Sequence, residues 1–301
     1  MEKYTKPSLT YVQQVDLLKK RGLIIGDPAA AERCLKQISY YRLSAYCLPF
    51  EVVRHQFKPG VTFEQIIRLY EFDRRLRFLI DEALEVIEIS VRAITSHEMA
   101  QKYGPFFHEE PKNFFVKFDH AAWVEKVHDE ARRSREIFIA HYKRKYDGFP
   151  RLPIWVAVEI MSFGSISLMI DHLKREDQLI LARQFGLHTS LLMSWLHTFA
   201  YVRNICAHHA RLWDRKLAIA MVAPKEPRWN DVDPTRLGSV VLAINQFLYR
   251  LPIDGEILSG WRKEIVDLFE KTPEVDGLWT SMGLPRRIQE HRLWQEKAPV
   301  I

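Results

Sequence analysis

The sequence predicts an all-α protein, and three observations lead to this class. The 12 glycines and 15 prolines fall mostly between long segments in which apolar residues recur at steps of three and four, as along one face of a helix. Several of these segments begin with residues that cap helices. The sequence contains no alternating run long enough to indicate a sheet. We therefore expect a bundle of amphipathic helices.

Short helices are expected near the N-terminus. Thr10 and Gln13 form a capping box, which predicts the start of a first helix. Asp27 stands directly before a proline, a pair typical of an N-cap and the first helical position, and predicts a second helix. The aromatic segment 38–50 is expected to continue as helix and to end near its proline.

The longest helix is expected over residues 63–101. Thr62 and Gln65 form a second capping box at its start, and no glycine or proline follows before Gly104. Further helices are predicted over 119–146, 153–162, 165–174, 176–185, 189–213, 235–250 and 256–271. The chain divides into an N-terminal helical region (1–60), a helical core (61–220) and a C-terminal helical region (221–301).

Composition limits the classes of function. The formal net charge of +6 permits an anionic partner without requiring one. The cysteines Cys34, Cys47 and Cys206 show no C-x-x-C spacing, so we expect neither disulfides nor structural zinc, and we expect a cytoplasmic protein. No apolar run of about 18 residues predicts a membrane span. Neither H-E-x-x-H nor a phosphate-binding glycine loop occurs, so we expect no metal, no cofactor and no nucleotide hydrolysis.

The segment 194–215 (SWLHTFAYVRNICAHHARLWDR) carries the most chemical information. On a helical wheel its apolar stripe consists of Leu192, Trp195, Phe199, Val202 and Cys206. The opposite stripe is polar and consists of Ser190, Ser194, His197, Tyr201, Asn204, His208 and Arg215. Arg203 lies between the two stripes. The wheel predicts that His208 points away from the core and that His209 points partly into it.

The polar stripe suits chemistry on a phosphate. Histidine titrates near neutral pH and can transfer protons, and the arginine fork matches phosphate oxygens. Solvated helix faces usually carry Lys and Glu, which this stripe lacks, although a solvated face remains the plain alternative. Arg203-Asn204-x-x-x-His208 also fits the pattern R-x(4–6)-H with a polar residue after the arginine.

The chain resembles the abortive-infection proteins of the AbiD/AbiF-like family over about residues 6–215. The matching segments, in family order, are 6–23, 38–50, 57–93 and 202–215. Asp214 stands where many relatives are expected to carry Asn, and we expect only a local effect on capping or on an interface. The resemblance implies a HEPN-like helical bundle that usually dimerises and that acts in bacterial defence against phage, with some members being toxins restrained by a small RNA.

The resemblance also implies a reaction. HEPN nucleases cut RNA without a metal, using one R-x(4–6)-H motif from each protomer of a homodimer. Carried over, Arg203, Asn204 and His208 are the catalytic residues. His208 would exchange protons with the 2′-hydroxyl or the departing oxygen, and Arg203 would stabilise the charge on the phosphate. We therefore expect a metal-independent endoribonuclease of a phage-defence or toxin–antitoxin system, with a non-catalytic, RNA-regulated RNA-binding protein as the alternative.

Other residues are candidates for RNA contact. Aromatic rings can stack on bases, and arginines can hold phosphates. The candidates are Tyr40, Tyr41, Arg42, Arg74, Arg77, Arg92, His197, Tyr201, Arg211 and Arg215. For the tyrosines, packing on the bundle is the alternative. For the segment 70–92, the alternative is i,i+4 ion pairing on a solvated face, as between Asp73 and Arg77.

Overall fold

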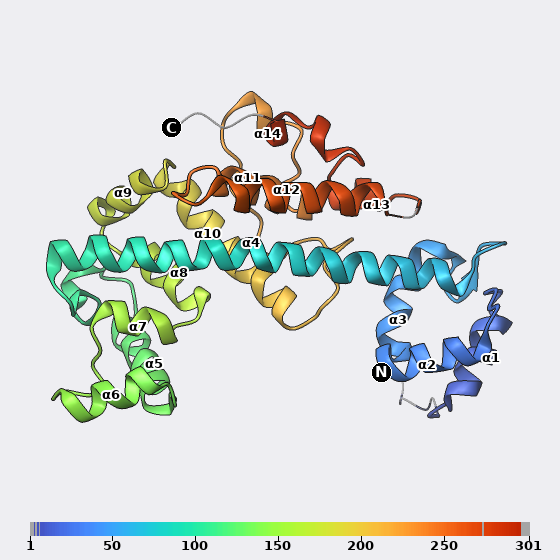
Figure 1. Ribbon diagram of the computed structural model, residues 1–301, viewed down its shortest axis with the longest axis horizontal. Coiled ribbons are helices and arrows are strands. Elements are labelled where there is room, and N and C mark those ends of the chain that lie inside the picture. Colours follow the sequence, from blue (N-terminus) through green and yellow to red (C-terminus); the bar gives the residue numbers. More distant parts are fainter. Residues whose placement is uncertain (1–2, 4, 6, 273, 296–301) are drawn as a thin grey trace.

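The computed structural model describes residues 3, 5, 7–272 and 274–295, and it confirms the all-α class (Figure 1). The molecule is organised around α4 (Phe63–Tyr103), a helix of 41 residues, which is about 60 Å long. Thr62 caps it through the predicted box with Gln65, and it ends at Gly104, whose φ of 89° suits glycine. Helices from all three expected regions of the chain pack against α4.

The N-terminal arm packs at the start of α4. It contains α1 (Tyr11–Lys20), α2 (Pro28–Ile38) and α3 (Tyr40–Cys47), and the caps Thr10 and Asp27 form as predicted. The segment 40–50 is helical and ends near its proline as predicted, but it does not continue from α2, because Ser39 takes a φ of 66° and separates α2 from α3. A short hairpin of β1 (Glu51–Val53) and β2 (Gln56–Phe57) follows a 3₁₀ turn, and its strands are too short to give an alternating pattern.

A second arm leaves the other end of α4. After two 3₁₀ turns, it contains α5 (His120–Arg133), α6 (Ile137–Lys145) and α7 (Ile154–Ile160). The single helix predicted over 119–146 is wrong. Ser134 adopts an extended backbone, and its hydroxyl accepts a hydrogen bond from the Glu136 amide at 3.3 Å. Serine side chains that bond to nearby backbone compete with the helix in this way, and here the helix breaks.

The remaining helices cover α4 along its length. They are α8 (Phe163–His172), α9 (Arg175–Gln184), α10 (Thr189–Ala207), α11 (Leu237–Leu248), α12 (Gly255–Glu270), α13 (Leu278–Met282) and α14 (Arg292–Gln295). All 12 residues of α11 are buried, since it packs against α4, α10, α12 and α14. The C-terminal region is therefore part of the same packed body as α4. Among the described residues, no helix combines the length and apolarity needed to cross a bilayer.

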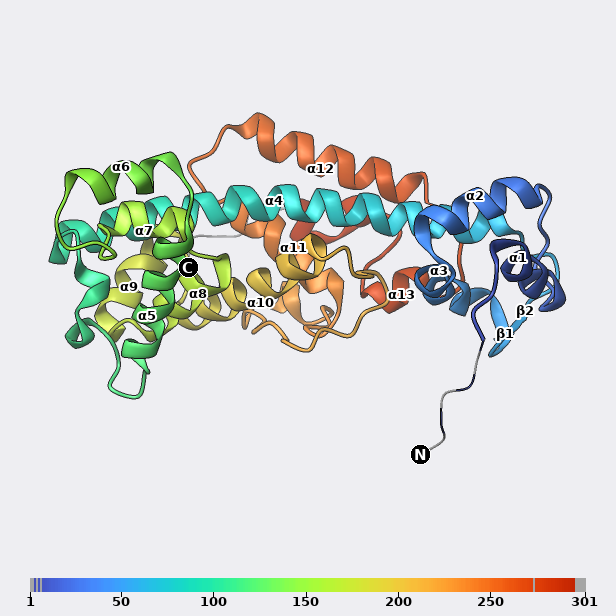
Figure 2. The same ribbon diagram turned by 90° about the horizontal axis from the view of Figure 1, so that it is seen from below.

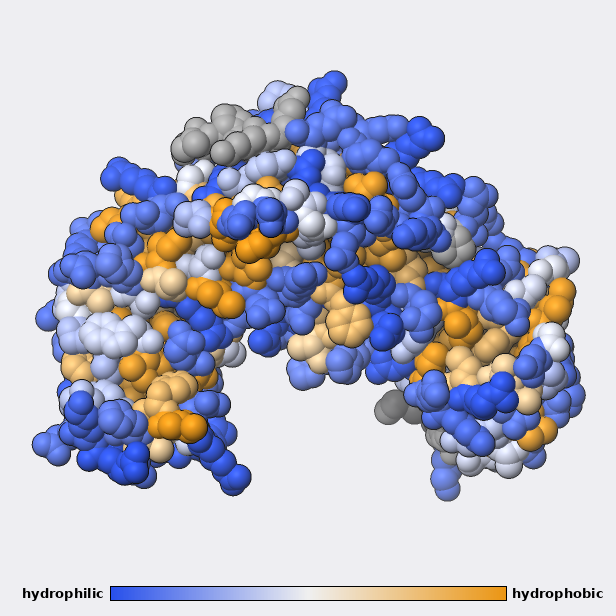
Figure 3. Space-filling view, viewed as in Figure 1, coloured by the Kyte–Doolittle hydropathy of each residue, from blue (hydrophilic) through white to orange (hydrophobic). Residues whose placement is uncertain are grey.

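The molecule is an arch. The N-terminal arm and the second arm extend from the two ends of α4 towards the same side, and the space-filling view shows an open concave face between them (Figures 1 and 3). Seen from that side, α10 lies beside α4 between the two arms (Figure 2). The segment with the most chemical information thus lies at the centre of the concave face.

The second arm contains a buried histidine with an unusual environment. His108 is 1% exposed, and neither ring nitrogen has a hydrogen-bond partner within the described residues. Burial lowers the pKa of His108 to about 3, and the positive groups of His128, His120 and Arg151 act in the same direction. The Glu109 carboxylate lies 3.9 Å from its Nε2 atom, but it is closer to His128, at 2.8 Å.

This histidine should make stability depend on pH. Its folded pKa is below the ordinary value of 6.5, so the unfolded chain binds a proton that the folded chain does not bind, and stability falls as pH falls from 6.5 towards 3. Between pH 7 and 4.5 we expect His108 to contribute a loss of roughly 2–3 kcal/mol in the free energy of unfolding. Urea unfolding at pH 7 and at pH 4.5 measures this difference in the free energy of unfolding.

The matched variants are His108→Phe and His141→Phe. His141 is exposed on α6, so its variant should keep the pH dependence of the wild type, whereas His108→Phe should reduce it. If the free energy of unfolding changed equally with pH in all three proteins, the pKa of His108 would not differ between the folded and unfolded chains, and the prediction would be wrong.

Candidate active site

The helix that carries the motif ends earlier than predicted. α10 ends at Ala207 rather than near residue 213; His208 is its C-cap, and His209 takes a left-handed φ of 54°. Angles on the helical wheel therefore do not apply beyond Ala207. His208 is exposed, as predicted, but His209 is exposed too, so the prediction that it points partly into the core is wrong.

A buried carboxylate explains this early end. Asp73, on α4, is fully buried and accepts hydrogen bonds from the backbone amides of Leu212, at 3.0 Å, and Trp213, at 2.7 Å. It also accepts from the Tyr46 hydroxyl at 2.7 Å and from the Arg77 guanidinium. The chain leaves the helix because its amides bind this carboxylate. The alternative that placed the Asp73–Arg77 pair on a solvated face is therefore wrong.

Arg203 faces α4 and its acidic side chains. Its Nε atom lies 3.5 Å from Oε2 of Glu88, whose side chain is only 7% exposed. A hollow of about 320 Å³ is lined there by Arg203, Asp81, Glu85, Glu88, Ile89 and Arg92. The side chain of Arg203 is 37% exposed, so its guanidinium is held by Glu88 and is still open to solvent.

Glu88 is held in turn by Arg92. The Arg92 guanidinium bonds to Glu88 and also donates to the carbonyls of Val158, at 2.7 Å, and Met161, at 2.9 Å, where α7 ends. Helix C-termini attract cations, so this arginine joins α7 to α4. The sequence made Arg92 a candidate for RNA contact. In the structure, both of its terminal guanidinium nitrogens donate hydrogen bonds to other groups of the protein.

His209 faces a second hollow, next to that of Arg203. This hollow has a volume of about 240 Å³ and is lined by Tyr70, Arg74, Arg77, Phe78, Asp81, Cys206, Ala207 and His209. Asp81 lines both hollows. Burial raises the pKa of Asp81, whereas the charges of Arg203 and His209 act to lower it. Asp81 therefore shares one hollow with Arg203 and the other with His209.

The other face of α10 matches the predicted polar stripe. A hollow of about 600 Å³ between α10 and α8 is lined by Ser190, Ser194, His197, Tyr201 and Asn204, with Asp171 and other residues opposite. Asn204 therefore lines a different hollow from Arg203. The structure does not bring the side chains of Arg203, Asn204 and His208 together in one cavity of this chain.

The remaining candidates surround the end of α10. Arg42 donates to the carbonyl of His209, and Arg211 donates to the carbonyl of Ala45 at 3.3 Å. Arg215 donates to the carbonyl of Arg211 at 2.9 Å. Arg42 and Arg211 thus fix the segment 208–215 against α3, while the Arg215 bond lies within the segment.

The other candidates differ in exposure. Tyr41 is 89% exposed, while the half-buried Tyr40 accepts a hydrogen bond from Arg21. Arg74 pairs with Glu71 at 3.3 Å and lies over the Phe78 ring. The hydroxyl of Tyr201 accepts from the Ala218 amide at 3.5 Å. Tyr41 is thus the candidate most open to a base.

The sequence assigned no functional role to two residues of this arrangement, His209 and Asp81, whereas Glu88 was expected to lie beside the motif. His209 also fits R-x(4–6)-H after Arg203, with five intervening residues, so the pattern itself could have included it. The roles of Asp81 and Glu88 depend on how α10 packs on α4, which no local pattern records. Among the described residues, no group of three or more His, Cys, Asp or Glu side chains is placed to hold a metal ion.

Comparison with known proteins identifies a family for the chain. Residues 33–214 match the model of a family described as Abi-like protein, a range that begins in α2 and ends just after the segment bound by Asp73. No curated protein matches the chain. No solved structure matches it either.

Removing the Asp73 carboxylate should destabilise the protein strongly. Asp73→Ala leaves the Arg77 guanidinium buried without its ion-pair partner and leaves the Leu212 and Trp213 amides unbonded. Breaking a buried pair on one side costs about 3–5 kcal/mol. Urea denaturation measures the change, and Glu82→Ala, at an exposed position on the same helix, is the control. A loss no larger than that of the control would contradict the role given to Asp73.

Proposed function

Because the chain belongs to the Abi-like protein family, we propose that it acts in bacterial defence against phage as a metal-independent endoribonuclease of the HEPN type. The observation that carries the proposal is the end of α10. There an arginine that remains open to solvent lies within six residues of two exposed histidines, and the backbone after them is fixed by Asp73. A rigid site with these groups suits proton transfer beside a phosphate.

The reaction follows from RNA chemistry. The 2′-hydroxyl of the substrate is the nucleophile, and a histidine removes its proton or protonates the departing 5′-oxygen. Arg203 stabilises the negative charge that develops on the phosphate. The products are a 2′,3′-cyclic phosphate and a 5′-hydroxyl. DNA lacks the 2′-hydroxyl and is therefore not a substrate.

Two histidines compete for the role of general acid or base. His208 follows the spacing of the motif and is our first assignment. The surroundings of His209 favour it as the alternative, because it shares a hollow with Asp81, and its carbonyl is held by Arg42. A catalytic imidazole usually has a neighbouring group that orients it, and a carboxylate serves this purpose well. Asn204 is exposed and lines a different hollow from Arg203, so in a homodimer it would contact the second copy or its substrate.

One observation favours a second function. Arg203 is already paired with Glu88, so the motif arginine has a structural partner within its own chain. A non-catalytic RNA-binding protein, regulated by a small RNA, would use this pair to organise the fold. In that case exposed residues such as Tyr41 and Arg42 would carry the RNA contact.

Single histidine variants test the proposal. We expect the purified chain, stripped of nucleic acid, to cleave mixed cellular RNA in EDTA and to leave cyclic phosphate ends. Substitution of the true catalytic histidine by alanine, in His208→Ala or His209→Ala, should lower the rate by about 100-fold or more. His141→Ala, at an exposed position in the second arm, is the control and should cleave as the wild type does. The 3′ ends are identified as cyclic phosphates if alkaline phosphatase removes their phosphate only after dilute acid has opened the ring.

The outcomes separate the two functions. Loss of cleavage in one histidine variant, with RNA binding retained, assigns the catalytic role to that histidine. Full activity in both variants would refute the HEPN mechanism. RNA binding without cleavage by the wild type, abolished in Tyr41→Ala with Arg42→Ala, would favour the regulated binding protein.

A further inference from the structure

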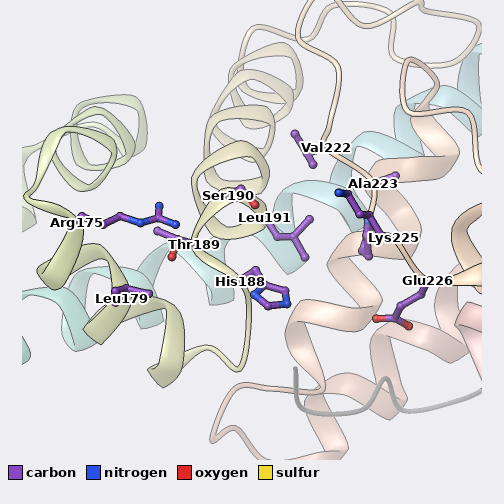
Figure 4. Close-up of a pocket in the computed structure, with 11 residues that line it drawn as sticks. Arg175, Leu179, His188, Thr189, Ser190, Leu191, Val222, Ala223, Lys225 and Glu226 are labelled. Carbon is purple, nitrogen blue, oxygen red and sulfur yellow. The ribbon is translucent and has the colours of Figure 1, made fainter.

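A second concave site lies at the opposite end of α10. A hollow of about 590 Å³ forms where the first turn of α10 meets α9 and the segment 222–226 (Figure 4). The 19 residues of α10 rise about 1.5 Å each, so this hollow lies roughly 25 Å from the end that carries the motif. We propose that it binds a nucleoside phosphate, which is a function beyond the ribonuclease site.

The helix start provides a place for a phosphate. His188, the N-cap residue, makes no side-chain hydrogen bond to the first turn. Within the described chain, the backbone amides of Thr189 and Ser190 have no hydrogen-bond acceptor, whereas those of the next two residues bond to the His188 carbonyl. Free amides and the positive end of the helix dipole attract anions.

Thr189 gives an independent indication of a ligand. It is only 3% exposed, lines the hollow, and its hydroxyl makes no hydrogen bond to any described residue. The oxygen is not fully enclosed by protein, so it is open to the hollow, where a phosphate oxygen can bond to it. Figure 4 shows Thr189 in the first turn of α10, facing Arg175 and Leu179 of α9.

The charges around the hollow favour an anion. Arg175, His188 and Lys225 line it, and the structure shows no ion-pair partner for Arg175 or Lys225 among the described residues. The lining also includes the carboxylate of Glu226, which is paired with Arg228 at 2.6 Å. Arginine can bind two phosphate oxygens at once, which gives orientation as well as affinity.

The rest of the wall is apolar. Leu179, Leu191, Val222, Ala223 and Pro224 line it, and Leu179 and Val222 are 39% and 47% exposed. Such a wall would cover a flat base, and the volume lies within the range of about 300–1,000 Å³ found for small-ligand pockets. A phosphate group joined to a base is a nucleotide. The phosphorylated end of an RNA chain presents the same chemistry, so both sources are tested.

Direct binding measurements test the proposal without any need for RNA cleavage. Isothermal titration of the full chain, stripped of nucleic acid, uses AMP, GMP, CMP, UMP and a 5′-phosphorylated trinucleotide as probes. We expect at least one probe to bind. Arg175→Ala should weaken binding about tenfold, since it removes a charge-assisted contact to the phosphate. Thr189→Val, of nearly the same shape, should weaken it several-fold by removing the hydroxyl.

Arg183→Ala is the matched control, because Arg183 is exposed in the last turn of the same helix as Arg175. It should bind as the wild type does, and thermal unfolding of each variant shows that the fold is intact. Binding of mononucleotides assigns the site to free nucleotides, and binding of the trinucleotide alone assigns it to phosphorylated RNA ends. The proposal is overturned if no probe binds to the wild type, or if binding is unchanged in both Arg175→Ala and Thr189→Val.

Discussion

The candidate active site depends on one buried carboxylate. Burial takes the charge of Asp73 out of water, and this costs free energy unless the carboxylate is paired and fully hydrogen-bonded. Here Arg77, Tyr46 and two backbone amides supply the bonds. Through them, α3, α4 and the segment after α10 are fixed to one another. The positions of His208 and His209 follow from this contact, because it decides where the helix ends.

The end of the helix carries local strain that this contact offsets. His209 has a φ of 54°, a conformation that residues other than glycine rarely adopt. Such residues persist when their surroundings hold them, and they cluster at functional sites. Arg42 binds the His209 carbonyl from α3, and Asp73 binds the amides three and four residues later. The fold therefore places a histidine where a regular helix would not.

The sequence predicted correctly the helix starts that are set by interactions between residues close in the chain. The capping boxes at Thr10 and Thr62 lie within single turns, and both helices begin where the sequence indicates. The end of α10 was mispredicted because Asp73 lies 139 residues before Leu212, and no periodicity connects them. The break at Ser134 depends on one side-chain bond that a wheel ignores. The polar stripe of α10 was correct as far as Ala207, which is as far as the helix extends.

The same reasoning explains why basic residues were assigned to RNA too readily. Many arginines here bind carbonyls at helix C-termini: Arg92 at α7, Arg211 at α3 and Arg42 at α10. Carbonyls at a C-terminus lack helical partners, and guanidinium groups supply several donors each. A net charge of +6 therefore overstates the positive charge that is available to a ligand. Along α10 the two ends differ: the C-terminus holds arginines already engaged with the protein, while the N-terminus presents free amides beside Arg175 and Lys225, whose charges no described side chain neutralises.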